Sequence, residues 1–445
     1  INKTEMNIYA LSSGRGPSGI AIIRLSGQDT FKIVELISKK KNLKPKEANL
    51  CKFYDPSNNN IIDEGLLLLF PGPNSFTGDD LAEFHIHGSN AVVEFFLKVL
   101  SKMDNSRLAE PGEFTKIAFQ NNKIDLIEAE SIGDLIHAET ELQRQQAIKL
   151  VQGSASVYYN NLREKLIKSL AYIEAKIDFA EDDLPPSVLT EVQNTIKEVH
   201  GDIKKILEDQ KIGEKIRDGF KVSIIGEVNA GKSSLLNLLS KREAAIVSEE
   251  EGTTRDVIET YLNIDGYPVI LADTAGIRDS KNEIEKKGVL LAINKSKDSD
   301  LNIILIDNSS KQVGDKILNI INNNSIVVLN KSDVYSKINH NFKEAILISV
   351  KKKKNIDTLI NKIKEKLREK FITSDNVLIT RERHREKLNA CLKEIDRFLK
   401  KDQNKDIEMA AEDLRLATRH LGGIVGKVDV EEILGSIFKD FCIGK

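Results

Sequence analysis

The stretch Gly226-Glu-Val-Asn-Ala-Gly231-Lys232-Ser233 decides the fold, because it fits the pattern G-x-x-x-x-G-K-[ST] of a phosphate-binding loop. It follows the β-rich run Lys221–Ile225 and precedes a helical stretch that begins at Lys232, which is the context such a loop requires. The glycines let backbone amides curl around a phosphate, and the helix N-terminus adds its positive dipole. We expect Lys232 to reach the outer phosphates and Ser233 to hold a magnesium ion.

Further β-rich runs follow this loop, and helical stretches alternate with them, which predicts a parallel sheet wrapped by helices. The runs are Val269–Ala272, Asn302–Ile306, Ser325–Leu329 and Ala345–Ile348. On either side, from about Asp125 to Gln210 and from Leu378 to the end, apolar residues recur at the three- and four-residue spacing of helices. The simplest account is one helical domain interrupted by an inserted α/β domain.

In the first 120 residues, short β-rich runs such as Gly19–Leu25 and Leu66–Phe70 are separated by clusters of Gly, Pro, Ser and Asn, which predicts a small α+β domain. The sequence therefore predicts a multidomain protein with an α+β N-terminal domain, an all-α helical domain and an inserted α/β P-loop G domain. The expected boundaries are 1–120 for the N-terminal domain, 217–373 for the G domain, and 121–216 with 374–445 for the two parts of the helical domain.

The composition argues against several classes of protein. Lys and Arg total 66 and Asp and Glu total 68, a net charge of -2, so any RNA contact must be local or supplied by a partner. The three cysteines form no Cys-x-x-Cys pair, which argues against a disulfide framework and a structural zinc site. No apolar run is long enough to span a membrane, and the N-terminal residues do not resemble a leader, so we expect a cytoplasmic protein without membrane contact.

Two motifs downstream of the loop are typical of a nucleotide-dependent switch. Asp273-Thr-Ala-Gly276 follows a β-rich run, so we expect its carboxylate to reach the magnesium through water while the Gly276 amide faces a γ-phosphate. The second motif is the polar segment Gly252-Thr253-Thr254-Arg-Asp, which lies between the phosphate loop and Asp273 in the sequence. A threonine of this segment can complete magnesium coordination only while a triphosphate is bound.

The remaining motifs select the base. Asn330-Lys-Ser-Asp333 follows the run Ser325–Leu329, and Asp333 can accept hydrogen bonds from a ring nitrogen and the exocyclic amine of guanine, which adenine does not offer in that arrangement. The backbone of Ser349-Val350, after the last run, can touch the guanine carbonyl. The residues expected to contact GTP are Asn229, Ala230, Gly231, Lys232, Ser233, Ser234, Ser248, Glu249, Glu250, Glu251, Gly252, Thr253, Thr254, Asp273, Thr274, Ala275, Gly276, Asn330, Lys331, Asp333, Ser349 and Val350.

Hydrolysis must be organised differently from Ras-like proteins, because Ile277 stands where those proteins carry a glutamine that orients water. Asn229 could supply an oxygen to a monovalent cation, with carbonyls of the polar segment around Gly252 closing a cage. Glu285 could orient the water once the switch moves. From the residues alone, however, Glu285 stands among other charged side chains and is more typical of a helix surface.

Segments spread over nearly the whole chain resemble the MnmE (TrmE) family of tRNA-modification GTPases. They are Gly14–Gly27, Ser75–Glu83, Arg107–Leu126, Asn229–Asn237, Gly252–Asp256 and Phe441–Lys445. The resemblance implies a homodimer joined through N-terminal domains, each of which binds 5,10-methylene- or 5-formyl-tetrahydrofolate. It also implies a heterotetramer with MnmG (GidA), a partner that alone holds the FAD and NADH.

In this family, GTP hydrolysis serves the addition of an aminomethyl or carboxymethylaminomethyl group to carbon five of the wobble uridine in certain tRNAs. The folate supplies the one-carbon unit, and potassium-dependent dimerisation of the G domains activates hydrolysis. The resemblance therefore implies a GTP hydrolase with K⁺ and Mg²⁺ as cofactors, which binds GTP, GDP and tRNA.

Carried over to this sequence, the resemblance assigns residues to distinct roles. The implied folate contacts are Arg24, Glu83, Lys123 and Lys445. The implied magnesium ligands are Ser233 and Thr254, and the implied potassium cage is Asn229, Ser248, Glu250 and Thr253. Glu285 matches the general base, which favours the catalytic reading of that residue, and Cys442 is either a nucleophile or a small apolar residue of a final helix.

Elementary chemistry is compatible with the folate residues, because Arg or Lys can clamp carboxylates and a carboxylate such as Glu83 can pair with the amide face of a pterin. From the residues alone, Arg24 and Lys123 are more typical of surface salt bridges. His85 and His87 share one face of an expected strand, a spacing that could bind a metal, although no third ligand is evident. The run Lys351–Lys354, which follows Ser349-Val350 in place of the family's usual Ser-Ala, is interpreted as a solvated turn.

Two classes of function remain open on this basis. The first is an enzyme, a GTPase whose hydrolysis drives a tRNA-modifying complex. The second is a regulatory switch or RNA-assembly factor that does no covalent chemistry on RNA. The folate-like residues together with Cys442 and Lys445 favour the first, since assembly factors append a recognisable RNA-binding domain, which the sequence does not show.

Overall fold

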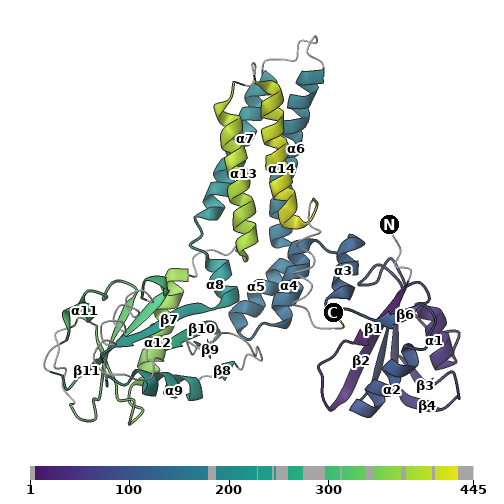
Figure 1. Ribbon diagram of the computed structural model, residues 1–445, viewed down its shortest axis with the longest axis horizontal. Helices are drawn as coiled ribbons and strands as arrows, with labels where there is room; N and C mark the ends of the chain where they lie inside the picture. The colour runs from purple at the N-terminus through teal and green to yellow at the C-terminus, as the bar shows by residue number, and fades with distance from the viewer. Residues whose placement is uncertain are drawn as a thin grey trace, which may run out of the picture. The chain divides into compact units, whose positions relative to one another are not determined.

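The computed structural model describes residues 6–178, 187–227, 229–242, 245–246, 259–273, 296–310, 313–335, 342, 344–371, 377–402, 406–428 and 444 (Figure 1). The chain divides into two compact units, the first made of 1–133, 150–189 and 401–445 and the second of 134–149 and 190–400. Each unit contains helices from both expected parts of the helical domain. The boundaries expected from the sequence stay a prediction.

The first unit begins with a six-stranded sheet of order β3-β4-β5-β2-β1-β6. Its strands are β1 (Asn7–Leu11), β2 (Ser18–Ser26), β3 (Asn49–Tyr54), β4 (Ile61–Phe70), β5 (Leu81–Gly88) and β6 (Ser106–Leu108). Neighbouring strands run antiparallel except β1 and β6, which are parallel. The strands expected near Gly19–Leu25 and Leu66–Phe70 are thus confirmed.

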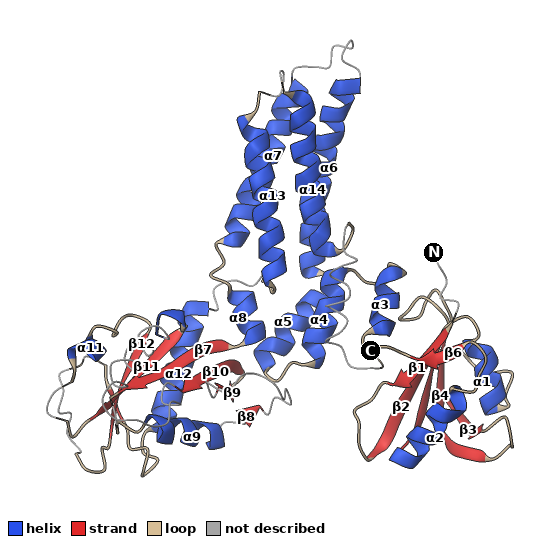
Figure 2. Cartoon of the chain, viewed as in Figure 1, coloured by secondary structure: helices blue, strands red, loops and turns tan. Residues whose placement is uncertain are grey.

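The two faces of this sheet have different partners because side chains alternate along a strand. Helices α1 (Thr30–Ser38) and α2 (Asn90–Leu100) cover one face (Figure 2), where the rings of Phe53, Phe84 and Phe96 meet with centroids 4.9–5.6 Å apart. On the other face, Phe114 and Ile117 of α3 (Glu113–Gln120) pack on the β1 residues Ile8 and Ala10.

Besides α1, α2 and α3, the described part of the first unit contains most of α4 (Leu126–Ile136), α6 (Ser154–Asp178) and α14 (Ile407–Val425). Leu162, Leu166 and Ile173 of α6 are buried at helical spacing, as the sequence pattern predicts. The long helices α6 and α14 pack on each other, and Arg415 Nη2 donates to Glu174 Oε1 across the pair at 3.0 Å.

The second unit contains a seven-stranded sheet of order β13-β12-β11-β7-β10-β9-β8. Its strands are β7 (Phe220–Gly226), β8 (Ala245–Ile246), β9 (Glu259–Ile264), β10 (Tyr267–Asp273), β11 (Leu301–Asp307), β12 (Ser325–Asn330) and β13 (Ile346–Leu347). The five strands expected from β-rich runs are present and parallel, whereas β8 and β9 form an antiparallel extension that the sequence analysis missed. The dipeptide Asp265-Gly266 lies between β9 and β10, and this dipeptide is a strong sequence indication of a β-hairpin turn.

Both faces of the second sheet are covered. Leu235 of α9 (Lys232–Arg242) and Leu359 of α12 (Ile356–Phe371) pack with Ile224 on one face. On the other face, Ile225 and its neighbours pack against the short helix α11 (Asp315–Leu318). This confirms a parallel sheet between helices.

The chain enters and leaves this sheet through helices that contact each other. The remaining helices of the unit are α5 (Glu141–Val151), α7 (Ser187–Leu207), α8 (Ile212–Asp218) and α13 (Glu382–Lys400). Arg385 of α13 donates to both carboxylate oxygens of Glu214 in α8, at 3.1 and 2.6 Å. Since α8 leads into β7 and α13 follows α12, the α/β domain is an insertion between helices, as expected. Within the described residues, no helix combines the length and apolarity needed to cross a membrane.

Candidate functional site

Parallel pairing brings the nucleotide motifs to one edge of the second sheet. The register places Asp273 of β10 beside Ile224, Gly226 beside Leu305, and Asn330 beside Asp307. The carboxyl ends of parallel strands meet at one edge, which is where open α/β sheets bind their ligands. The structure therefore gathers the phosphate loop, the backbone of Asp273 and the Asn330–Asp333 motif, as the sequence predicts.

Two glycines of the phosphate loop are required by close approaches. A Cβ at Gly226 would lie 2.1 Å from the carbonyl oxygen of Leu305, and one at Gly231, whose φ is +99°, would lie 2.6 Å from Asn330 Nδ2. Lys232 Nζ donates to the carbonyls of Gly226 and Glu227 at 3.0 and 2.9 Å. The ammonium group is thus held at the mouth of the loop, where a phosphate can compete for it.

The first turn of α9 follows the loop directly and carries Lys232, Ser233 and Ser234. Both serines are exposed, so their hydroxyls and the backbone amides of the turn are accessible to a phosphate or a hydrated cation. The exposed Ser233 hydroxyl suits a magnesium ion, for which hard oxygen ligands and several waters are the usual shell. Its expected companion Thr254 lies outside the described residues.

The base-recognition motif is tied to the phosphate loop by Asn330. Its Nδ2 donates to the Ala230 carbonyl at 2.8 Å, and its Oδ1 accepts from the Val350 amide at 3.1 Å. Ser349 Oγ donates to Asp333 Oδ1 at 2.6 Å. This hydrogen bond, aided by Lys351 and Lys352, holds the pKa of the exposed Asp333 carboxyl below its usual value. The carboxylate is therefore ionised at neutral pH and ready to accept from a base.

Two side-chain contacts of this motif were not expected from the sequence. Ser349 was expected to act through its backbone, and its hydroxyl also orients Asp333. Asp307, at the end of β11, belongs to no predicted motif, yet its Oδ2 lies 2.5 Å from Lys331 Nζ. The signal was present, because a polar residue directly after a buried parallel strand stands at the ligand-binding edge.

Several predicted residues lie outside the described part of the chain, so their roles stay predictions. They are Ser248, Glu249, Glu250, Glu251, Gly252, Thr253, Thr254, Thr274, Ala275, Gly276, Glu285, Cys442 and Lys445. Of the expected potassium cage only Asn229 is described, as an exposed residue with φ +66° in the phosphate loop. Ile277, the departure from Ras-like proteins, also lies outside.

The folate-like residues of the first unit meet on the face of the N-terminal sheet that carries α3. Arg24 of β2 and Glu83 of β5 are directly paired, and Arg24 Nε and Nη2 donate to Glu83 Oε1 at 3.1 and 2.7 Å. The Arg24 guanidinium lies 5.7 and 5.6 Å from the ring centroids of Phe76 and Phe114. A partly buried ion pair beside two aromatic rings suits a flat, polar heterocycle such as a pterin.

One further predicted folate position, Lys123, is described in the structure. Lys123 Nζ donates to the Pro73 carbonyl at 2.7 Å, in the loop that also carries Phe76. The penultimate residue Gly444 accepts a hydrogen bond from Ser12 Oγ at 2.7 Å, just after β1, and β1 pairs with β2. Gly444 thus lies next to the residue that follows β1, the strand paired with the one that carries Arg24, and Lys445 lies outside the described residues.

The histidine pair does not form a metal centre. His87 is largely exposed and its Nδ1 lies 2.9 Å from Asp63 Oδ1, while His85 Nε2 lies 3.8 Å from Glu83 Oε2. Among the described residues, no group of three or more His, Cys, Asp or Glu side chains is arranged to hold a metal ion.

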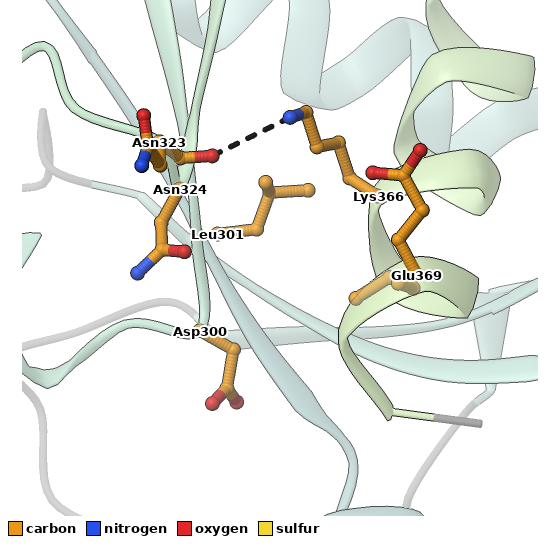
Figure 3. A pocket seen from close by; sticks show the side chains of 7 residues that line it. Asp300, Leu301, Asn323, Asn324, Lys366 and Glu369 are labelled. Carbon is orange, nitrogen blue, oxygen red and sulfur yellow. Dashed lines mark hydrogen bonds between the residues drawn. The ribbon is translucent and has the colours of Figure 1, made fainter. Parts of the chain in front are cut away.

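A separate pocket of about 240 Å³ is shown in Figure 3. Its lining is Asp300, Leu301, Asn323, Asn324, Lys366, Leu367 and Glu369. These residues flank the amino-terminal ends of β11 and β12 and the last turns of α12, and Lys366 Nζ donates to the Asn323 carbonyl at 3.4 Å. It contains no residue of the predicted nucleotide site, because that site requires the opposite edge of the sheet.

Two family models and several curated proteins match nearly the whole chain. The model of the MnmE helical domain matches residues 126–442, and that of the GTP-binding protein TrmE N-terminus matches residues 7–123. The tRNA modification GTPase MnmE of Pelagibacter ubique (strain HTCC1062) is 58% identical over 443 residues, which cover 99% of this chain and 100% of that protein. The tRNA modification GTPase MnmE of Parvibaculum lavamentivorans is 43% identical over 98% of this chain and 99% of its own length. The mitochondrial tRNA modification GTPase gtpbp3 of Dictyostelium discoideum is 39% identical over 98% of this chain and 95% of its own length.

Proposed function

The chain belongs to the MnmE family of tRNA modification GTPases, and we propose that its GTP hydrolysis drives the modification of wobble uridine in certain tRNAs. The GTPase activity is supported best by the two hydrogen bonds of the Asn330 side chain. They join the Ala230 carbonyl of the phosphate loop to the Val350 amide of the segment that also holds Asp333. The same edge of the second sheet therefore offers hydrogen-bond donors to the phosphates and the Asp333 carboxylate to guanine.

In this proposal, different described residues bind the phosphates, the magnesium ion and the base of GTP. Lys232 exchanges its loop carbonyls for phosphate oxygens, and the first turn of α9 adds amides and the Ser233 hydroxyl. A magnesium ion at Ser233 would neutralise charge on the outer phosphates. Asp333 selects guanine, since a base without the two matching donors leaves its carboxylate unpaired.

For the modification itself, we propose that the N-terminal unit binds 5,10-methylene- or 5-formyl-tetrahydrofolate at Arg24 and Glu83. The support is the direct pair of Arg24 with Glu83 Oε1 and the two aromatic rings near the Arg24 guanidinium. A flavin- and NADH-using partner, MnmG, would complete a heterotetramer with a homodimer of this chain. Together they would add an aminomethyl or carboxymethylaminomethyl group to carbon five of the uridine. Potassium-dependent G-domain dimerisation through Asn229 would activate hydrolysis.

The GTPase proposal is tested by steady-state hydrolysis with the full chain. We expect GTP but not ATP to be hydrolysed in magnesium and potassium chloride, and Asp333→Asn to lose GTP hydrolysis at low substrate concentration. Equal use of ATP and GTP by the unchanged chain would refute guanine selection. Mass spectrometry of wobble uridines in tRNA from cells lacking this protein tests the modification, which should be lost.

Calorimetric titration with 5-formyl-tetrahydrofolate tests the folate site. We expect Glu83→Gln and Arg24→Gln each to weaken binding at least tenfold, because either change leaves the other charge without its partner. Glu47→Gln, which breaks the exposed Lys44–Glu47 pair of the same unit, is the matched control and should bind normally. A chain that hydrolyses GTP but binds no folate at saturation would instead favour a switch without covalent chemistry on RNA.

A further inference from the structure

Asp307 is held in one orientation at the ligand-binding edge of the second sheet. It ends β11 and stands in register beside Asn330 of β12. Its Oδ1 accepts hydrogen bonds from the amide and hydroxyl of Ser309, at 2.9 and 2.6 Å. Its Oδ2 accepts from Lys331 Nζ at 2.5 Å. Both oxygens therefore have partners, and the carboxylate cannot turn without losing one set.

The Asp307–Lys331 pair completes the anchoring of the base-recognition motif. Asn330 is anchored by the phosphate loop and Val350, and Asp333 is anchored by Ser349. Lys331 lies between them and has a flexible four-carbon stem, whose rotamers are fixed only at an entropic cost. The contact with Asp307 supplies that restraint.

The pair is poorly explained as a device for folding. Its side chains are 35% and 20% exposed, and ion pairs of that kind contribute little to stability. Lys331 also has φ +67°, a left-handed conformation that costs energy for a residue other than glycine. The position of the pair at the ligand-binding edge of the sheet therefore accounts for it better than a gain in stability does.

The ionisation of Asp307 is consistent with a permanent anchor. Burial raises the pKa of its carboxyl, but the hydrogen bonds from Lys331 and Ser309 outweigh burial and bring the pKa below its usual value. The carboxyl of Asp307 is therefore charged throughout the neutral range.

We propose that Asp307 is a positioning residue for guanine binding, which holds the stem of Lys331 as a wall against the face of the base whose edge Asp333 recognises. An ordered aliphatic stem can cover a flat ring while its charged end stays paired elsewhere. The inference rests on the proposed GTPase function and names a residue through which that site gains its affinity.

The test is the dissociation rate of a fluorescent GDP, mant-GDP, from the full chain in magnesium buffer. Asp307→Asn preserves the shape and an acceptor for Ser309 but removes the charge that holds Lys331. We expect dissociation to accelerate about tenfold, which corresponds to about 1.4 kcal/mol, while kcat at saturating GTP stays within about twofold. Glu365→Gln breaks the Lys362–Glu365 pair, 3.0 Å long and remote from the motif in the same unit, and should change neither rate.

A double-mutant cycle separates positioning from a structural role. Lys331→Ala should accelerate dissociation at least as much as Asp307→Asn, and adding Asp307→Asn to Lys331→Ala should change the rate by less than about twofold. If Asp307→Asn accelerates mant-GDP dissociation by the same factor with and without Lys331→Ala, the inference is overturned. An unchanged dissociation rate in Asp307→Asn would overturn it too. If Asp307→Asn fails to fold, a normal rate in Lys331→Ala overturns it as well. Failure of the unchanged chain to bind mant-GDP would instead refute the GTPase proposal.

Discussion

Removal of Arg385 should destabilise the second unit strongly, because this guanidinium compensates two carboxylates in a largely buried setting. Arg385 is 8% exposed and so is Glu214, with which it makes hydrogen bonds of 3.1 and 2.6 Å. It also donates to Asp209 Oδ1 at 2.8 Å and to the Leu207 carbonyl at 3.2 Å. Arg385→Met fills most of the volume but leaves Glu214 buried without its partner.

The magnitude follows from that uncompensated charge. Breaking a buried ion pair by removing one partner costs about 3–5 kcal/mol. At roughly 2–4 °C per kcal/mol for a unit of this size, the melting temperature should fall by roughly 6–20 °C. The exposed pair Arg144–Glu141 of the same unit provides the control, and Arg144→Met should shift the melting temperature by less than about 1 °C.

Differential scanning calorimetry of the full chain measures these shifts. The informative comparison adds Glu214→Met to Arg385→Met, since the second change removes the orphaned carboxylate. The double variant should recover a large part of the loss, because apolar replacement of a buried pair is often neutral. A single variant that melts within about 2 °C of the unchanged chain, or a double variant no more stable than the single one, would show that Glu214 does not depend on Arg385 for compensation of its charge.

The remaining predictions concern the nucleotide site and the thiols. Asp333→Asn should weaken GTP binding on the order of 10²-fold or more and create affinity for the xanthine nucleotide, whose base offers the complementary group; fluorescence competition measures both. Asn229→Ala should abolish the acceleration of hydrolysis by potassium over sodium, and unchanged cation selectivity would rule out the cage. Cys51 and Cys391 are buried and burial raises the pKa of each thiol, so neither should react with iodoacetamide in the native chain at pH 8. Peptide mass mapping checks this, with labelling at either site before unfolding as the contrary result.

The parallel strands and the phosphate loop could be predicted because their signals are local. The runs Asn302–Ile306 and Ser325–Leu329 are almost wholly buried, and each nucleotide motif follows its run within a few residues, so strand ends and motif positions are fixed together. The hairpin of β9 and β10 was missed although Asp265-Gly266 marks its turn, since β9 carries mixed residues in Glu259–Ile264 rather than an apolar run. Tertiary pairing with β10 stabilises that strand more than its own composition does.

The place of Asp307 at the ligand-binding edge could be predicted from its position after a strand, but its partner could not, because contacts between strands depend on register rather than on spacing along the chain. Asp307 meets Lys331 only because β11 and β12 pair so that Asp307 stands beside Asn330. A shift of that register by one residue would turn the side chains of one strand to the opposite face. Arg385 and Glu214 are 171 positions apart in the sequence, and the strands of the α/β domain lie between them. Their contact depends on the fold that brings α8 and α13 together. Sequence motifs thus identify the groups that touch GTP, whereas the groups that hold them in place follow from the fold.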